Sequence, residues 1–468
     1  MGIIKRGYNM SELFDLNIEQ VLEDWEIEHA LREIIANALD EQTLTKTSPI
    51  EIYNTGTEWH IRDYGRGLRY RHFTQNENRE KLFSPNLIGK FGVGLKDALA
   101  VFFRKGVKVE IDSRFAHITL RMANKTGFDV STLHAVFSDP LDTQMKGTDF
   151  TFIGIDEEAV ERAKALFLCF NKEAVLLEKN KYGEVYKNKR KGDSSIYING
   201  VKVASEDNFL FSYNITNLSY KIKQALNRER SNVGRAAYSD TVKSILKSCI
   251  SIKVLLPLME DLQNVMKGKN CDESAWLDVA AYAAKTLNDA DDVVFMTPSK
   301  RDSLSNQDKE ILQESGKRLI MVTDKVYSKI NSSVVTFDDV YKKHIEEYKY
   351  EYVEYNDLTL DERKVFDTKQ YVIEFLKKYN YKYDANIRVS ETIRPDYNAG
   401  EADGVWDSGE NAIIIRRCVL SNIKRFLGVL IHEFAHYTSG EPDNCRAFEN
   451  VLTYMLGKAL FEANINKM

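Results

Sequence analysis

Hydrophobic residues recur at helical spacing between Glu28 and Glu41, so this stretch predicts an amphipathic helix. Three polar residues in it, Glu33, Asn37 and Asp40, follow the spacing i, i+4, i+7 and therefore share one face of that helix. Such a face is most often the solvent-exposed side of a surface helix. Three stretches further along the chain favour a different interpretation.

Each of these three stretches places glycines next to a predicted strand or helix. They are Asp63-Tyr-Gly-Arg-Gly67 after the strand 58–62, Gly89-Lys-Phe-Gly-Val-Gly94 before the apolar helix 95–103, and Gly147-Thr148 before the strand 149–153. Glycines permit tight turns and close approach of the backbone to a ligand. Glycines before a helix also form an anion cradle, because free backbone N–H groups and the helix dipole point the same way. Any one of these stretches alone is more often a loop than a nucleotide site.

Together and in this order, the helix and the three stretches resemble the motifs of the GHKL ATPases, which include gyrase B, the ninety-kilodalton heat-shock chaperone, histidine kinases and MutL. The glycines from Gly89 to Gly94 and the helix after them are most similar to those of the heat-shock chaperone and the microrchidia (MORC) ATPases. The resemblance implies a Bergerat fold, an α/β sandwich of helices on a sheet, in residues 1–155. It also implies ATP and Mg²⁺ as ligands, an ATP lid over residues 68–88, and a homodimer formed through this domain.

The resemblance implies a role for each matching residue. Glu33 matches the general base that activates the attacking water, and Asn37 matches the residue that holds Mg²⁺ on the phosphates. Asp63 matches the carboxylate that accepts a hydrogen bond from the adenine amino group. The other residues expected at the nucleotide are Asp40 and Thr148 near the adenine, and Gly65, Gly67, Gly89, Gly92 and Gly94. A carboxylate base, an amide oxygen for a hard cation and a backbone cradle suffice for phosphoryl transfer.

Residues 156–270 predict a helix from Asp156 to about Lys172, a hairpin over 194–203 with an Asn199-Gly200 turn, and further helices. This order resembles the transducer-like domain of several GHKL enzymes, in which a basic residue reaches the γ-phosphate. Arg228 is the first candidate for that role and Arg230 the second, with surface salt bridges as the alternative. The basic stretch 179–191 favours a solvated hairpin tip over a contact with nucleic acid.

Residues 271–345 alternate between helices and short strands, which predicts a small β-α-β connecting module. The strands are expected at 292–296 and 319–322, with Val334-Val335 as a third, and a charged helix over 341–357 follows. Residues 346–468 are expected to form the last domain. The expected fold class is therefore α+β with four domains.

The last domain contains His432-Glu433-Phe-Ala-His436, inside an apolar helix predicted from Val419 to about Gly440. A second helix is predicted from Pro442-Asp443 to Glu462. Histidines at i and i+4 share one helical face and reach one Zn²⁺, while Glu433 beside them can deprotonate a water molecule. A strand at 411–416 followed by this helix resembles the zincin metallopeptidases. The third ligand is open between Glu449 on the next helix, which is preferred, and Asp443, which is also well placed as a helix N-cap.

Composition excludes few classes of protein. The 468 residues are 43% hydrophobic and 29% charged, as in an ordinary globular chain long enough for several domains. A net charge of −5 gives no global attraction to nucleic acid or to an anionic membrane. Five scattered cysteines without a C-x-x-C pair indicate a reducing compartment, and no apolar run reaches transmembrane length, so a cytoplasmic protein is expected.

The function predicted from these motifs is an ATP-hydrolysing GHKL protein whose nucleotide state gates a zinc-dependent peptidase acting on a protein substrate. The alternative is a chaperone-like or DNA-associated ATPase whose metal domain is structural or a binding module. Structural zinc sites are closed by four protein ligands, whereas catalytic sites keep one position open.

Overall fold

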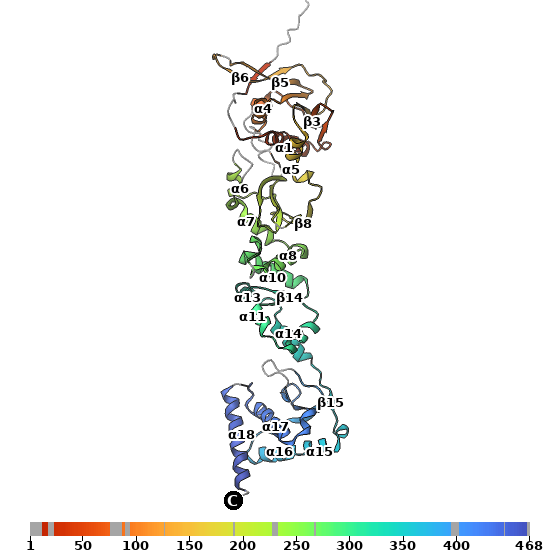
Figure 1. Ribbon diagram of the computed structural model, residues 1–468, viewed down its shortest axis with the longest axis vertical. Coiled ribbons are helices and arrows are strands. Elements are labelled where there is room, and N and C mark those ends of the chain that lie inside the picture. The colour runs from red at the N-terminus through yellow and green to blue at the C-terminus, as the bar shows by residue number, and fades with distance from the viewer. Residues whose placement is uncertain are drawn as a thin grey trace, which may run out of the picture. The chain divides into compact units, whose positions relative to one another are not determined.

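The computed structural model describes residues 12–16, 23–74, 87–88, 94–125, 127–190, 192–226, 233–265, 268–394, 402–443 and 445–465 (Figure 1). The chain forms two compact units, one of residues 1–291 with 328–330 and one of residues 292–327 with 331–468. Both units contain helices and strands, so the predicted α+β class is confirmed. The division into four domains stays a prediction. None of the described helices is both long and apolar enough to cross a membrane.

A seven-stranded antiparallel sheet of order β1-β6-β5-β4-β7-β3-β2 opens the first unit. Its strands are β1 (Glu12–Asp15), β2 (Glu51–Asn54), β3 (Glu58–Asp63), β4 (Lys108–Ser113), β5 (Ala116–Asn124), β6 (Ser131–Ser138) and β7 (Thr148–Ile153). The helices are α1 (Ile27–Thr45), α2 (Arg71–Thr74), α4 (Gly94–Arg104) and α5 (Glu157–Ala165). Helices α1, α4 and α5 share one hydrophobic core with the sheet, because the apolar stripes predicted for the first two face inward.

A second sheet follows in the same unit, with order β11-β10-β12-β9-β8. Its strands are β8 (Val175–Lys179), β9 (Gly183–Lys187), β10 (Ser194–Ile198), β11 (Val201–Glu206) and β12 (Phe211–Ile215). The predicted hairpin over 194–203 is confirmed, and both Asn199 and Gly200 have positive φ in its turn. The helices after the sheet are α6 (Tyr220–Ala225), α7 (Arg235–Leu246), α8 (Ile252–Leu262), α9 (Asp272–Ala275) and α10 (Leu277–Ala290).

The helix predicted from Asp156 to about Lys172 is shorter than expected. Asp156 does cap it, since its carboxylate accepts a hydrogen bond from the backbone N–H of Ala159 at 2.7 Å. The helix ends at Ala165, because Phe167 is buried in the core and pairs with Val201 as an isolated β-bridge. A short 3₁₀ turn, η1 (Leu168–Phe170), follows.

The second unit begins with a two-stranded parallel sheet of β13 (Val293–Met296) and β14 (Arg318–Met321). The third strand expected at Val334-Val335 is absent from the described residues there, since only a single bridge joins Phe295 to Thr336. The helices of this part are α11 (Pro298–Ser303), α12 (Asn306–Glu314), α13 (Asp324–Ile330) and α14 (Phe337–Glu347). The charged helix predicted over 341–357 therefore ends at Glu347, because the chain extends at Tyr348 and then enters the last sheet.

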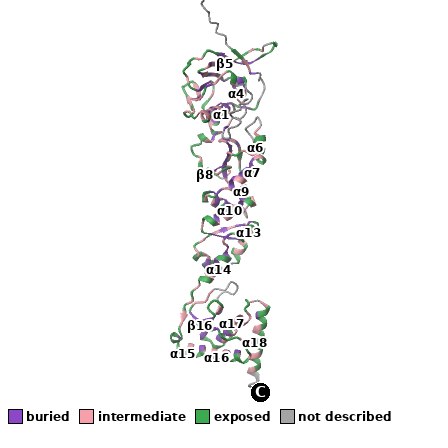
Figure 2. Cartoon of the chain, turned by 180° about the vertical axis from the view of Figure 1, so that it is seen from behind, coloured by how far each residue is buried: buried purple, intermediate pink, exposed green. Residues whose placement is uncertain are grey.

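The last sheet has the order β15-β16-β18-β17. Its strands are β15 (Tyr352–Val353), β16 (Asn386–Ser390), β17 (Gly404–Asp407) and β18 (Ala412–Arg416). The other elements are η3 (Tyr355–Asp357), α15 (Leu360–Asp367), α16 (Lys369–Lys378), η4 (Arg417–Ser421), α17 (Ile423–Ser439) and α18 (Arg446–Ile465). In Figure 2, burial follows the strands and α17, whereas α18 is mostly exposed or intermediate.

The helix that carries the two histidines starts four residues later than predicted. Residues 417–421 form the 3₁₀ turn η4, and Asn422 caps α17 by accepting hydrogen bonds from the backbone N–H groups of Lys424 and Arg425. The end of α17 is as predicted, because Gly440 takes the left-handed conformation with φ +68°.

Candidate nucleotide and metal sites

Helix α1 holds Glu33, the predicted general base, in a buried ion pair. The Arg32 guanidinium donates to Oε1 of Glu33 from Nε at 3.2 Å and from Nη2 at 3.1 Å, and Arg32 is only 1% exposed. The indole ring of Trp25 lies 5.1 Å from the guanidinium carbon. Arg32 was not among the site residues predicted from the sequence. Its signal was a charged side chain beside Leu31, in the apolar part of the predicted helix.

Asp63 and Thr148 lie directly opposite each other where β3 and β7 pair. Both are buried, and the Asp63 carboxylate accepts a hydrogen bond from the backbone N–H of Gly65 at 2.8 Å. Burial raises the pKa of Asp63 to about 6, with a smaller contribution from the charge of Glu41 and opposing hydrogen bonds from Gly65 and Thr148. Ser113 at the end of β4 pairs with Thr148 from the other side and was not predicted.

The glycines around these strand ends have little space for a side chain. Gly147 has φ +78°, and a Cβ atom there would collide with the carbonyl oxygen of Asp63. Gly67 has φ +86° and lies next to the Gly147 carbonyl, while a Cβ atom at Gly65 would strike the Glu41 side chain. Glu41 also pairs with Arg66 through two hydrogen bonds of 2.9 Å. The end of α1 is thereby joined to the loop after Asp63.

The described residues at either end of the predicted phosphate loop lie close to α1. At its C-terminal end, a Cβ atom on Gly94 would collide with Oε2 of Glu33. Just before its N-terminal end, the backbone N–H of Ile88 donates to Oδ1 of Asp40 at 2.6 Å. Glu33 and Asp40 are seven residues apart, about 10 Å along the helix, with Asn37 between them on the same face. Gly89 and Gly92 lie outside the described residues, as do Arg228 and Arg230.

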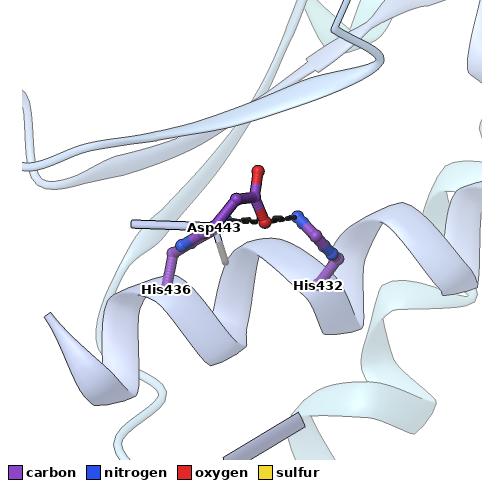
Figure 3. A group of neighbouring side chains, drawn as sticks. All are labelled: His432, His436 and Asp443. Carbon is purple, nitrogen blue, oxygen red and sulfur yellow. Dashed lines mark hydrogen bonds and ion pairs between the residues drawn. The ribbon is translucent and has the colours of Figure 1, made fainter. Parts of the chain in front are cut away.

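His432, His436 and Asp443 form a three-residue cluster in the last domain. Figure 3 shows both imidazoles projecting from one face of α17 toward the Asp443 carboxylate. The two Nε2 atoms are 3.1 Å apart, and Oδ1 of Asp443 lies 3.3 Å from that of His432 and 3.4 Å from that of His436. The turn at Gly440 brings Asp443 back over the helix. This is the largest set of metal-capable groups found among the described residues.

The spacing and chemistry of these three groups fit a tetrahedral metal ion. Ligands at 2.0–2.1 Å from a tetrahedral Zn²⁺ are about 3.3–3.4 Å from one another, which is close to the three distances observed. The Glu441 carbonyl lies 2.8 Å from Nδ1 of His436 and can only accept a hydrogen bond, so Nδ1 carries a proton. In the neutral ring the Nε2 lone pair then faces the cluster, as a metal ligand requires. Burial lowers the pKa of His432, which favours the neutral ligand form.

The two candidates for the third ligand are placed differently from what we expected. Asp443, the alternative, is in the cluster, whereas Glu449, the preferred one, is exposed on α18 and is not part of it. The reason is Phe448, whose buried ring stacks on the His436 imidazole with centroids 4.1 Å apart. The next residue on a helix is rotated by about 100°, so Glu449 turns away from the histidines.

Glu433 is buried between α17 and the edge strand β17. Its Oε2 accepts a hydrogen bond of 2.8 Å from the backbone N–H of Trp406. Gly404 in the same strand leaves room for it, since a Cβ atom there would lie 3.2 Å from Cγ of Glu433 and 2.6 Å from a methyl group of Val429. Glu433 is therefore oriented by the backbone of β17.

The basic stretch 179–191 begins in the hairpin of β8 and β9. Two of its lysines form ion pairs with carboxylates of the same module, Lys179 with Glu184 at 2.8 Å and Lys189 with Glu173. These pairs reduce the charge available for a phosphate backbone and fit the interpretation as a hairpin.

Comparison with known proteins shows that the second sheet lies within a region that a protein-family model matches. The family model of the Mycoplasma pneumoniae MPN635 N-terminal domain matches residues 158–252. A protein of Mycoplasma pneumoniae (strain ATCC 29342 / M129 / Subtype 1), described as uncharacterized, is 42% identical over 242 residues, which are 51% of this chain and 97% of that protein. This chain belongs to the same family as that protein. A second protein of that strain, described in the same words, is 25% identical over 359 residues, or 66% of this chain and 93% of its own length.

A solved structure is also similar to part of this chain. It is the ATPase region of Saccharomyces cerevisiae topoisomerase II bound to ICRF-187 (dexrazoxane), with 12% identity and a TM-score of 0.25 over 38% of this chain and 62% of that chain. A TM-score this low does not establish a common fold. Support for a nucleotide site therefore comes from the contacts of this chain's own residues.

Proposed function

We propose that residues 1–155 bind and hydrolyse ATP in the manner of a GHKL ATPase. The observation that supports this is how the four sequence motifs meet: two of the glycine-containing stretches contact α1, and the third pairs with the end of β3. Glu33 contacts Gly94, Asp40 contacts Ile88 just before Gly89, and Glu41 contacts the loop that follows Asp63. Asp63 in turn pairs with Thr148. A purely structural helix does not need two buried acidic side chains beside a glycine-containing loop.

In this proposal each residue has one task. Glu33, held by Arg32, takes a proton from the attacking water. The amide oxygen of Asn37 would help hold Mg²⁺, which neutralises phosphate charge when bound. Asp63 accepts from the adenine amino group beside Asp40 and Thr148, with Gly65 and Gly67 shaping the loop. Backbone N–H groups of Gly89, Gly92 and Gly94 hold the phosphates, and Arg228, with Arg230 as the alternative, stabilises the γ-phosphate.

A second function is proposed for the last domain, a zinc-dependent peptidase acting on a protein substrate. It is supported by the three ligand spacings of His432, His436 and Asp443. A Zn²⁺ held there would polarise a peptide carbonyl as a Lewis acid. Glu433, oriented by the Trp406 N–H, would remove a proton from the attacking water and pass it to the leaving amine. The alternative is a structural metal site in a chaperone-like or DNA-associated ATPase.

The complete proposal is that the nucleotide state gates the peptidase in a cytoplasmic homodimer. Gating requires that ATP bind more tightly to one of two conformations that differ in peptidase activity. Purified protein assayed for ATP turnover, zinc content and proteolysis tests these steps separately. A protein that neither binds nor hydrolyses ATP rejects the first function, and one that binds no zinc rejects the second.

A further inference from the structure

One peptide group before the predicted phosphate loop is held from both of its sides. Its carbonyl, that of Leu87, accepts a hydrogen bond of 3.0 Å from the side-chain amide of Asn199. Its N–H, that of Ile88, donates to the carboxylate of Asp40 at 2.6 Å. Because the C=O and N–H of a trans peptide point in opposite directions, Asn199 and Asp40 contact it from opposite sides. Hydrogen bonds linked through one peptide also strengthen each other.

The two groups that hold this peptide belong to two parts of the first unit, each built on a different sheet. Asp40 belongs to α1, which packs on the seven-stranded sheet. Asn199 belongs to the turn between β10 and β11 of the second sheet, within the module that the Mycoplasma family model matches. The Leu87–Ile88 peptide is thus a direct connection between that module and the helix carrying the candidate nucleotide residues.

The turn that carries Asn199 is itself fixed. Asn199 and Gly200 have φ of +47° and +82°. The backbone N–H of Asn199 donates to the Ile215 carbonyl at 3.1 Å, and that of Gly200 donates to the Asn214 side chain at 2.8 Å. The Gly200 carbonyl accepts from the N–H of Leu168 at 2.8 Å. The side chain of Asn199 therefore extends from a rigid support, which a positioning group requires.

We propose that Asn199 is a positioning residue for ATP turnover, through which the second module sets the orientation of the chain entering the phosphate loop. This inference rests on the proposed nucleotide function, because Gly89 directly follows Ile88. Backbone N–H groups stabilise transition-state charge only when they are aimed in advance. Loss of the Asn199 contact frees one side of the peptide, so turnover is expected to fall more than ATP affinity.

Two substitutions remove the contact and retain the turn. Asn199→Asp keeps the shape and tolerates positive φ, but places an oxygen opposite the Leu87 carbonyl. Asn199→Gly keeps the backbone conformation and removes the side chain. Asn411 offers a matched control, because it also has positive φ, 48°, in the turn before β18 of the second unit. The bond that its carbonyl accepts from the N–H of Asn386 is independent of its side chain.

The experiment compares both Asn199 variants with the Asn411 variants in the full chain. Hydrogen exchange without nucleotide should become faster in peptides containing Ile88, and kcat should fall by about 3- to 10-fold with KM changed less than about twofold. The Asn411 variants should change neither quantity. Unchanged exchange at Ile88, or an equal fall in kcat in the Asn411 variants, would overturn the role of Asn199. A wild type without ATP turnover would instead overturn the proposed function, while the exchange data still decide whether Asn199 holds the peptide.

Discussion

Asp63 at the end of β3 stands opposite Thr148 at the start of β7, and Gly147 before Thr148 lies directly against the Asp63 carbonyl. The carboxylate expected to recognise adenine is therefore fixed by its own strand pairing and by a glycine that leaves no space for a side chain. Its burial raises its pKa to about 6.

Nucleotide affinity should depend on pH through Asp63. Only the ionised carboxylate accepts freely from the adenine amino group, so affinity should be full above pH 7 and fall by about tenfold per unit below pH 6. The stability of the folded chain depends on pH in the opposite direction. The pKa of Asp63 is higher in the folded chain than in the unfolded chain, so its contribution to the free energy of unfolding is complete below about pH 4 and is lost as pH rises through 6. Affinity titrations of wild type and Asp63→Asn from about pH 5 to 8 measure the effect.

The Asp63→Asn variant also controls for the titration of the ATP phosphates themselves. A terminal phosphate titrates near pH 6 and affects both proteins equally. The ratio of the two affinities therefore isolates Asp63. A ratio that does not change with pH would contradict the assignment of Asp63 to the nucleotide.

Gly147→Ala should damage the adenine end of the site as well as the fold. The left-handed conformation alone costs about 1–3 kcal/mol with a side chain, and the collision with the Asp63 carbonyl adds to it. Gly106→Ala is the matched control, because Gly106 has nearly the same φ, +75°, but no atom near its Cβ position. Chemical denaturation should show a larger loss of unfolding free energy for Gly147→Ala. Equal losses in the two variants would mean that the contact with Asp63 is unimportant.

Zinc binding should distinguish Asp443 from Glu449. Asp443→Ala removes one of three converging ligands, so zinc affinity should fall by more than the roughly 10–100-fold typical of an outer-shell change. Glu449→Ala should leave affinity unchanged, since that side chain is exposed on α18. Competition with a zinc-binding dye measures both. The reverse order of effects would restore Glu449 as the ligand.

If ATP gates the peptidase, a non-hydrolysable ATP analogue should alter the rate of proteolysis by roughly 5- to 150-fold, the range of typical allosteric couplings. Glu433→Gln should keep zinc and ATP turnover and stop cleavage, because the ligands remain and only the base is lost. Digestion of a panel of proteins with and without the analogue tests both statements. A cleavage rate that is the same with and without the analogue would mean that ATP does not gate the peptidase.

The helices and strands of residues 1–155 were predictable because their signals are local. The spacing of Glu33, Asn37 and Asp40 is a property of one helix, and the positions of Asp63 and Thr148 follow from the strands that they end or begin. Contacts between distant segments were not predictable in this way. The burial of Arg32 against Trp25 and the bond from Asn199 to Leu87 both depend on tertiary packing.

The cluster of His432, His436 and Asp443 shows the same division between local and tertiary signals. The two histidines at i and i+4 are expected to meet in any helix, and Gly440 was a sound signal for its end. The choice between Asp443 and Glu449 depended on where α18 begins and on the ring of Phe448. A helix predicted from Pro442 onwards starts at Arg446, which leaves Asp443 in the turn above the histidines.

Glu33 is proposed as the general base of an ATPase, and the substitution Glu33→Gln tests this role. Glutamine is preferred to alanine, because loss of the group paired with buried Arg32 costs about 3–5 kcal/mol of stability. ATP hydrolysis and ATP binding should be measured for wild type, Glu33→Gln and Glu158→Gln, whose side chain is exposed in the same unit. We predict turnover reduced by about 10²- to 10⁴-fold in Glu33→Gln alone, with ATP still bound. Turnover equal to that of wild type in Glu33→Gln would contradict the mechanism.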